Sequence, residues 1–354
     1  MTSHSPAYGD VTVHPDTDAV VADLVARQVL EARDGATMER LAELEAKVTA
    51  NVRASRAEST LEAYASDWAD FTTWCKTIGL TPLPAAPGTV AAYLADMADP
   101  PDDREPLAHA TIVRRKASIG EAHKLAGHPN PCADELVKLA SKGIRRQIGV
   151  APQHRKAGVS TADMRAIVVG LDTERLIDVR DKALLLVGYA TALRRTSLVG
   201  LDVGDIEDHP QGMLVHLRRS KTDQEGAGAR IEVEYGTNPE TCPVRAYRTW
   251  TKAAGIVEGP VFRAVNRGGN ISPNRLSGKA VALIIKKHAA RIGKDPADFA
   301  GHSLRRGFAT EAARQGASER TIAHTTQHTS TKGLSPYIED AEVFTDPPSR
   351  YLGL

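Results

Sequence analysis

The sequence predicts a mainly α-helical protein with a small antiparallel β-sheet, an α+β fold with a helical N-terminal domain and a mixed C-terminal domain. Apolar residues recur at spacings of three and four through much of the chain, which is the period of a helix. Two short stretches, 213–218 and 231–235, instead alternate between apolar and polar residues and flank a polar loop, as the strands of a β-hairpin do. A chain of 354 residues favours two domains over one.

Residues 1–57 are expected to form a tail followed by a helical segment. Residues 1–18 lack periodicity, which is typical of a disordered tail. Residues 19–54 are rich in Ala and Leu and helical in pattern, with an interruption near Gly35. This segment is either a partner-binding arm or a solvated helix, and the solvated helix is the simpler interpretation because no chemical motif lies on it.

Residues 58–148 are predicted to form a compact helical domain. Five apolar residues at its start share one helix face, which we interpret as core packing: Leu61, Tyr64, Trp68, Phe71 and Trp74. Three further helices are expected at 87–97, 107–125 and 133–148. The stretch 99–106 is predicted to be a loop because it is rich in proline and charge.

Residues 149–160 are predicted to be a linker with cationic side chains. Ser160 and Asp163 form the N-terminal signal of a helix, which opens a C-terminal domain over residues 161–340. Residues 341–354 are expected to be a C-terminal tail. Besides the hairpin, the C-terminal domain is predicted to hold helices at 161–171, 177–192, 276–292, 303–315 and 319–324, another after Pro243, and a short one around Tyr337.

The charge of the chain is unevenly distributed. The total is 45 Lys and Arg against 44 Asp and Glu, a net charge of +1. Residues 1–57 hold 6 basic and 9 acidic side chains, residues 58–146 hold 10 and 12, and residues 147–354 hold 29 and 23. The last part therefore carries +6, which is a weak electrostatic indication of a polyanionic partner.

Several classes of protein are disfavoured by the sequence. No apolar run approaches the ~20 residues of a membrane span, and the N-terminus lacks the pattern of a secretory signal, so we expect no membrane association. Cys75, Cys132 and Cys242 lie far apart, which argues against a disulfide framework and fits a cytoplasmic protein. His324 and His328 make a poor metal site without a carboxylate or thiol beside them. We therefore expect neither metal nor cofactor.

The strongest motif is HSLRRGFAT at 302–310, which is followed by His328 and Tyr337. His302 and Arg305 are three apart and share one helix face. This arrangement resembles the tyrosine recombinase (phage integrase) family of Cre-like site-specific recombinases, whose second signature box reads HxLRxxFAT. The family places a His or Trp 23 residues after the box arginine and its nucleophilic Tyr nine residues further on, and both spacings hold here.

The resemblance extends to other elements and covers about residues 58–345. The family's first box, typically TGLRxxEL, stands here as TALRRTSL at 191–198 and supplies Arg194. The family's β-hairpin lysine corresponds to Lys221, for which Arg219, Lys279 and Lys286 are alternatives.

Each matched residue also has an ordinary structural explanation taken singly, such as a helix cap for Arg194 or a packing role for His328. The agreement of five elements in order favours the functional interpretation. The sequence departs from the family at three positions. Ala192 and Gln327 stand where Gly is usual, and Ser197 replaces an acidic residue.

The resemblance implies DNA strand cleavage and rejoining through a 3′-phosphotyrosine, without metal or ATP. Arg194 and Arg305 would hold the non-bridging oxygens of the phosphate, a task suited to planar, permanently charged guanidiniums. Tyr337 would be the nucleophile and His302 its base. The two remaining roles are a proton for the leaving 5′-oxygen from Lys221 and a hydrogen bond to the phosphate from His328.

The resemblance also implies the partners. Residues 58–148 would be a helical core-binding, SAM-like domain and residues 161–340 the tyrosine-recombinase catalytic domain, together clamping double-stranded DNA that carries specific recombination sites. The protein would act as a homotetramer on DNA and be a monomer or weak oligomer without it. Seven cationic residues are candidate contacts to the DNA backbone: Arg114, Arg115, Lys116, Arg145, Arg146, Arg155 and Lys156.

Two alternative functions stay open on the sequence. A type IB topoisomerase-like enzyme would use similar chemistry to relax supercoils without a specific site. A catalytically idle DNA-binding protein could have the same fold. The sequence of the target site, and the choice between integration, excision and resolution of mobile DNA, are not encoded in these motifs, because base contacts depend on groove positions.

Overall fold

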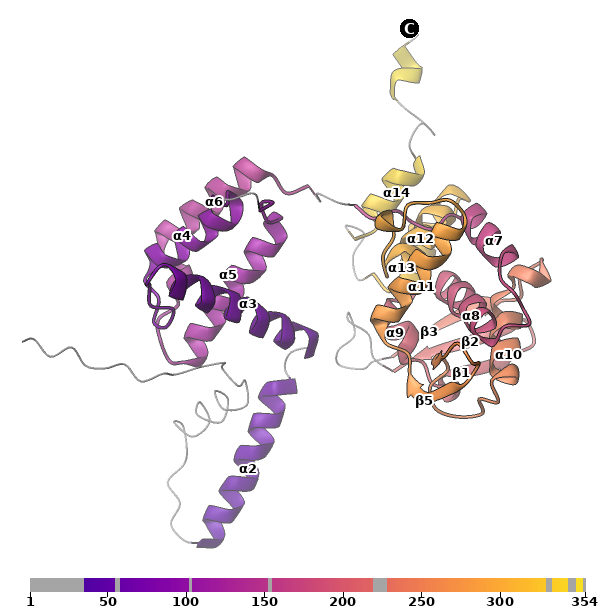
Figure 1. Cartoon of the computed structure of the whole chain (residues 1–354), viewed down its shortest axis with the longest axis horizontal. Helices are drawn as coiled ribbons and strands as arrows, with labels where there is room; N and C mark the ends of the chain where they lie inside the picture. The colour runs from indigo at the N-terminus through magenta and orange to yellow at the C-terminus, as the bar shows by residue number, and fades with distance from the viewer. Residues whose placement is uncertain are drawn as a thin grey trace, which may run out of the picture. The chain divides into compact units, whose positions relative to one another are not determined.

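The structure is a computed structural model that describes residues 35–54, 58–101, 104–151, 155–218, 228–328, 333–342 and 348–352. The chain divides into two compact units, 1–153 and 154–354 (Figure 1). The boundary falls within the segment 149–160 that the sequence predicts to be a linker. The predicted tail at 1–18 lies outside the described residues.

The first unit is helical throughout its described part, as the sequence predicts. Helix α2 (Gly35–Ala54) begins where the predicted helical segment is interrupted, and the earlier part of that segment is not described. A short 3₁₀ turn at Pro131–Ala133 precedes the last helix. The four helices of the core are α3 (Glu58–Thr77), α4 (Pro87–Ala98), α5 (His109–Leu125) and α6 (Glu135–Ile148).

Aromatic packing holds this first unit together. Trp68 and Phe71 of α3 are buried, and the Phe71 ring centroid lies 5.0 Å from that of Tyr93 on α4. The Trp74 indole also packs on Tyr93 and donates a hydrogen bond to Asp96 at 2.8 Å. These contacts confirm that the aromatic face of α3 packs in the core, because its rings contact residues of α4 and α5.

The second unit is mainly helical with two small antiparallel sheets, which confirms the predicted fold class. Its elements are α7 (Thr161–Val169), α8 (Leu176–Thr191), α9 (Arg195–Gly200), β1 (Ile206–His209), β2 (Gly212–Leu217), β3 (Ala229–Glu234), α10 (Pro243–Ala253), β4 (Arg263–Val265), β5 (Ile271–Arg275), α11 (Gly278–Arg291), α12 (Ser303–Arg314), α13 (Glu319–Thr326) and α14 (Ser335–Glu342).

The predicted hairpin is the β2–β3 pair. The two strands are antiparallel, with Val215 opposite Ile231, and both of these residues are fully buried. Strand β1 extends the sheet in the order β1-β2-β3, and β4 pairs with β5 separately; neither β1 nor this second pair is predicted from the sequence. The polar loop of the hairpin, 219–227, lies outside the described residues.

Helix α8 is the buried centre of the second unit. It packs against α10 and α12, and a Cβ added at Gly188 would lie 2.7 Å from a methyl of Leu198 and 2.8 Å from one of Leu304. These distances show that α8 approaches α9 and α12 closely. The close approach brings together the loop after α8 and the start of α12, which carry the two predicted box arginines.

The end of the predicted linker is part of the second unit. The backbone N–H of Val159 donates to the carbonyl of Ser303 at 2.9 Å, so this segment runs along the start of α12. A Cβ added at Gly307 would lie 1.9 Å from the Val159 carbonyl oxygen, so the contact requires glycine. Ser160 and Asp163 then form the predicted capping box of α7.

We expect Gly307→Ala to destabilise the second unit by about 1–3 kcal/mol, because the added methyl must displace the 155–160 segment. Hydrogen exchange of the α8 and α12 amides measures this free energy. Gly200→Ala is the matched control, since nothing lies within 4 Å of a Cβ there. Equal exchange in both variants would contradict the assigned contact.

Candidate active site

Arg305 is the central side chain of the site. It lies on the first turn of α12 and is 4% exposed. Its Nη1 donates to the carbonyl oxygen of Ala192 at 3.1 Å, and its Nη2 lies 3.3 Å from Nε2 of His328. One guanidinium therefore connects the loop after α8 with the end of α13.

Arg194 supplies a second positive charge beside it. It lies at the N-cap of α9, two residues after Ala192, and is half-buried. Burial lowers the pKa of Arg194, while the nearby Tyr337 phenol acts in the opposite direction. Burial and the charge of Arg194 lower the pKa of Arg305 to about 10. Both arginines remain cationic at neutral pH, and two like charges held in a partly buried site favour an anion between them.

The hydrogen bonds around His328 define its tautomer. The Thr326 hydroxyl donates its one proton to the Ile322 carbonyl at 2.6 Å, so it accepts from Nδ1–H of His328 at 2.8 Å. The Nε2 lone pair then faces Arg305. Burial and the charges of Arg305 and Arg194 lower the pKa of His328 to about 4. The imidazole is therefore neutral at pH 7 and presents an acceptor to the site.

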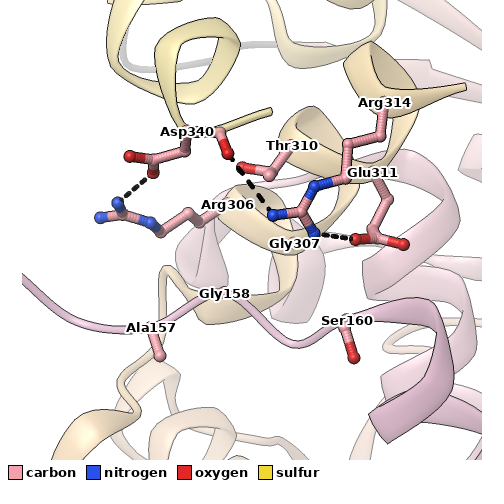
Figure 2. A pocket seen from close by; sticks show the side chains of 9 residues that line it. All are labelled: Ala157, Gly158, Ser160, Arg306, Gly307, Thr310, Glu311, Arg314 and Asp340. Atoms are coloured by element: carbon pink, nitrogen blue, oxygen red, sulfur yellow. Dashed lines mark hydrogen bonds and ion pairs between the residues drawn. The ribbon is translucent and has the colours of Figure 1, made fainter. Parts of the chain in front are cut away.

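Tyr337 lies on α14, beside these groups. Its ring centroid is 6.1 Å from that of His328, and the Cζ of Arg306 lies 5.9 Å from it on the ring face. Arg306 also pairs with Asp340, one turn further along α14, at 2.6 Å (Figure 2). The structure thus brings Arg194, Arg305, His328 and Tyr337 together.

The other two predicted catalytic residues are His302 and Lys221. His302 is exposed and precedes α12, one turn before Arg305, as the shared helix face predicts. Lys221 and its alternative Arg219 lie outside the described residues, and the alternatives Lys279 and Lys286 lie on α11.

The cations of the first unit predicted to contact DNA are partly engaged within it. Arg114 pairs with Asp67, and Arg115 pairs with Asp70 and donates to the Tyr93 hydroxyl at 2.8 Å. Lys116 donates to Ser141 at 3.2 Å. Arg145 and Arg146 are exposed on the last turn of α6.

The remaining two predicted cations lie in the second unit and bind other parts of it. Lys156 donates to the carbonyl of Ala297 at 2.8 Å, and Arg155 pairs with Asp340 at 2.9 Å. Arg155 therefore reaches the helix that carries Tyr337, a contact that sequence reasoning missed.

Two left-handed residues shape the site. Ala192, with φ of 50°, and Gln327, with φ of 54°, are the only non-glycine residues with positive φ in the part of the chain that the structure describes. They end α8 and α13 and stand just before Arg194 and His328. These are the two positions where the sequence lacks the glycine usual in the family it resembles, so the backbone shape is kept without it.

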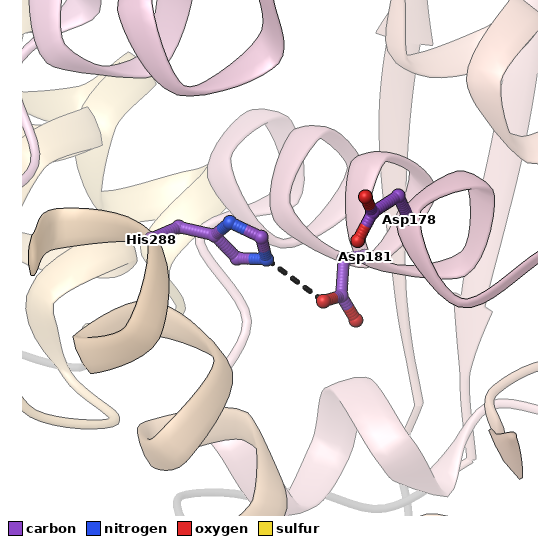
Figure 3. Close-up of side chains that lie close together, drawn as sticks. All are labelled: Asp178, Asp181 and His288. Atoms are coloured by element: carbon purple, nitrogen blue, oxygen red, sulfur yellow. Dashed lines mark hydrogen bonds and ion pairs between the residues drawn. The ribbon is translucent and has the colours of Figure 1, made fainter. Parts of the chain in front are cut away.

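Sequence reasoning also missed a buried cluster formed by Asp178, Asp181 and His288 (Figure 3). Among the described residues it is the one group of three such side chains close enough to bind a metal. Asp181 already accepts from His288 at 2.7 Å and pairs with Arg180 at 2.7 Å and Lys287 at 3.1 Å.

Cations therefore occupy the positions around these carboxylates that a metal would need. Although burial raises the pKa of Asp181, the hydrogen bond from His288 and the charge of Arg180 bring it below its ordinary value. The cluster is an ion network that joins α8 to α11. The sequence signal for this cluster is the spacing of Asp178 and Asp181, which lie three residues apart on a buried face of α8.

The buried Arg305 and the half-buried Arg194 lie beside a tyrosine in a mainly helical unit with small sheets, an arrangement suited to binding an anion. The sequence pattern of the phage integrase family matches residues 160–342. An integrase/recombinase XerD homologue of Selenomonas ruminantium is 39% identical over 314 residues, covering 88% of this chain and 90% of that protein. The chain belongs to the phage integrase family of tyrosine recombinases and is a site-specific recombinase.

A more distant relative and two solved recombinase structures are also similar to this chain. The Cre recombinase of Escherichia phage P1 is 26% identical over 319 residues, covering 85% of this chain and 89% of that protein. The XerH recombinase bound to its difH substrate shares the fold with a TM-score of 0.54 at 11% identity, covering 93% of this chain and 94% of that one. A lambda integrase dimer on a core site gives 0.53 at 17% identity, covering 84% and 95%. No described helix has the length and apolarity needed to cross a membrane.

We expect Thr326→Val to convert the single Nδ1–H tautomer of His328 into a mixture of tautomers, because the acceptor for Nδ1–H is lost. Long-range ¹H–¹⁵N NMR of the imidazole measures this as a mixture of Nδ1–H and Nε2–H forms in place of one. Thr325→Val is the control, since its hydroxyl bonds only the Thr321 carbonyl. A single unchanged Nδ1–H tautomer in Thr326→Val would refute the assignment.

We expect Asp181→Asn to lower the free energy of unfolding by about 3–5 kcal/mol at pH 7, because it leaves the buried Arg180 without its carboxylate partner. The pKa of Asp181 is lowered by folding, so its contribution is present above the ordinary pKa and lost as the pH falls through the folded value. In urea unfolding, the difference in unfolding free energy between wild type and Asp181→Asn should therefore become smaller as the pH falls. The pair of the exposed Glu240 with Lys182 provides the control, because solvent screens this pair and Glu240→Gln should change the free energy of unfolding far less.

Proposed function

We propose that this recombinase cleaves and rejoins DNA through a 3′-phosphotyrosine at Tyr337, without metal or ATP. One observation carries the proposal: within the residues that the structure describes, neither Arg194 nor Arg305 forms an ion pair with a carboxylate. Buried charge of this kind is costly unless an anion compensates it. A DNA phosphate supplies that anion, and Tyr337 is next to it.

The proposed chemistry assigns one role to each group, and the roles of His302 and Lys221 are those that the family resemblance implies. The guanidiniums hold the two non-bridging oxygens and stabilise charge that develops during attack. The Tyr337 oxygen attacks phosphorus and loses its proton to His302, while the leaving 5′-oxygen gains a proton from Lys221. The phosphodiester becomes a phosphotyrosyl ester of similar energy, so a 5′-hydroxyl can attack it in turn and release Tyr337.

His328 has a conditional role in this scheme. Its Nδ1–H is committed to Thr326, so only the doubly protonated ring can donate from Nε2 to a phosphate oxygen. A phosphate between Arg194 and Arg305 offsets the positive charges that disfavour that protonation. DNA binding would then be accompanied by proton uptake.

We further propose that the partner is double-stranded DNA with specific recombination sites, bound by a homotetramer, and that the role is integration, excision or resolution of mobile DNA. The relatives named integrase and recombinase, and the DNA complexes that share the fold, support this. The +6 charge of residues 147–354 is compatible with it. The coverage of 88% of the chain by a recombinase relative favours this over a topoisomerase-like function.

A nicked suicide substrate tests the proposal, with the site selected from a random DNA pool. We expect a covalent adduct in the presence of EDTA, none with Tyr337→Phe, and a rate about 10²- to 10³-fold lower with Arg305→Gln. Tyr235→Phe is the control. The enzymatic proposal fails if wild type bound to its verified site gives no adduct, and relaxation of a plasmid without the site would favour the topoisomerase-like alternative.

A further inference from the structure

Helix α14, which carries Tyr337, makes its apolar contacts with a small cluster on one side. Leu334, just before the helix, is fully buried against Ala309 and Ile322, while Tyr337 and Ile338 are only partly buried there. On the other side, between α12, α14 and residues 157–160, lies a polar pocket of about 340 Å³ lined by Arg306, Arg314 and Asp340, among others (Figure 2). Charged contacts therefore hold this side of α14 in place.

One carboxylate, that of Asp340, makes two of these contacts. Oδ1 of Asp340 accepts from Arg155 at 2.9 Å, and Oδ2 accepts from Arg306 at 2.6 Å. The second nitrogen of Arg155 donates to the Pro336 carbonyl at 2.6 Å, at the other end of the same helix. Arg314 reaches the Asp340 carbonyl at 3.4 Å. We call Asp340 with Arg155 and Arg306 the Asp340 clasp.

The two arginines of the clasp come from well-anchored backbone. Arg306 follows the central Arg305 in α12, and its guanidinium contacts both Asp340 and the face of the Tyr337 ring. The backbone that follows Arg155 is fixed by hydrogen bonds from Ala157 to Asp298 at 2.7 Å and from Val159 to Ser303 at 2.9 Å. The clasp thus ties the tyrosine helix to the same rigid helix start that holds the phosphate-binding arginine.

We propose that the Asp340 clasp is a positioning device that presents Tyr337 to the DNA phosphate, and that Arg155 acts there and not as a DNA backbone contact. The inference rests on the proposed nucleophilic role of Tyr337. The clasp leaves the reacting atoms untouched, so it affects the rate of attack and not the affinity for DNA. A displacement of about 1 Å at a reacting group costs on the order of 10²-fold in rate.

The test separates attack from binding. With saturating suicide substrate, we expect Asp340→Asn and Arg155→Gln each to slow adduct formation about 10- to 100-fold, with the DNA Kd within about twofold of wild type. The double variant should be slowed by less than the product of the two single effects, because both single variants remove the Arg155–Asp340 contact. Arg248→Gln is the matched control, since it removes the same charge from another arginine–aspartate pair of the second unit, with Asp208 at 2.7 Å, without touching α14.

Hydrogen exchange of the α14 amides adds a readout that needs no activity. Exchange should be faster in Asp340→Asn and Arg155→Gln than in wild type or Arg248→Gln, while α8 stays protected, which also shows that the variants fold. The proposal is overturned if α14 exchange is unchanged, or if Arg155→Gln weakens DNA binding while the saturated rate stays at the wild-type value. If wild type itself forms no adduct on a verified site, the proposed function fails, and the exchange data alone decide whether the clasp exists.

Discussion

The buried guanidinium of Arg305 is the interaction on which the site depends. It reaches the carbonyl of Ala192 on one side and His328 on the other, and so fixes the ends of α8 and α13 relative to α12. Burying such a charge is favourable only with good hydrogen bonds and a compensating anion. The uncompensated charge therefore costs folding free energy, and the proposed DNA phosphate would compensate it, as in electrostatic preorganisation.

The packing of the rest of the second unit holds Arg305 and its neighbours in place. Gly188 lets α8 approach α9 and α12, and Gly307 lets the 155–160 segment lie against α12. The network around Asp181 joins α8 to α11 inside the same core. Rigid packing around α8 and α12 is what holds two like charges near each other, since they would otherwise move apart.

Much of the fold and part of the site could be predicted from the sequence, because both depend on local periodicity and motif spacing. The helices, the β2–β3 pair and the grouping of Arg194, Arg305, His328 and Tyr337 belong to this class. Strand β1 and the β4–β5 pair could not be predicted, since three to five residues carry too little pattern. The clasp between Arg155 and Asp340 joins residues 185 positions apart, and no local pattern encodes such a pairing. Nor does composition distinguish an arginine that binds DNA from one that binds its own chain.

The left-handed conformations of Ala192 and Gln327 determine the conditions under which the site takes its shape. Glycine adopts this conformation by itself, whereas a residue with a Cβ pays about 1–2 kcal/mol for it and adopts it only where the surrounding structure enforces it. Arg194 and His328 follow directly from these two backbone turns. A chain with its helices formed but its core still loose would lack the packing that enforces these two turns. The geometry of the site is thus a property of the packed core and not of the individual helices.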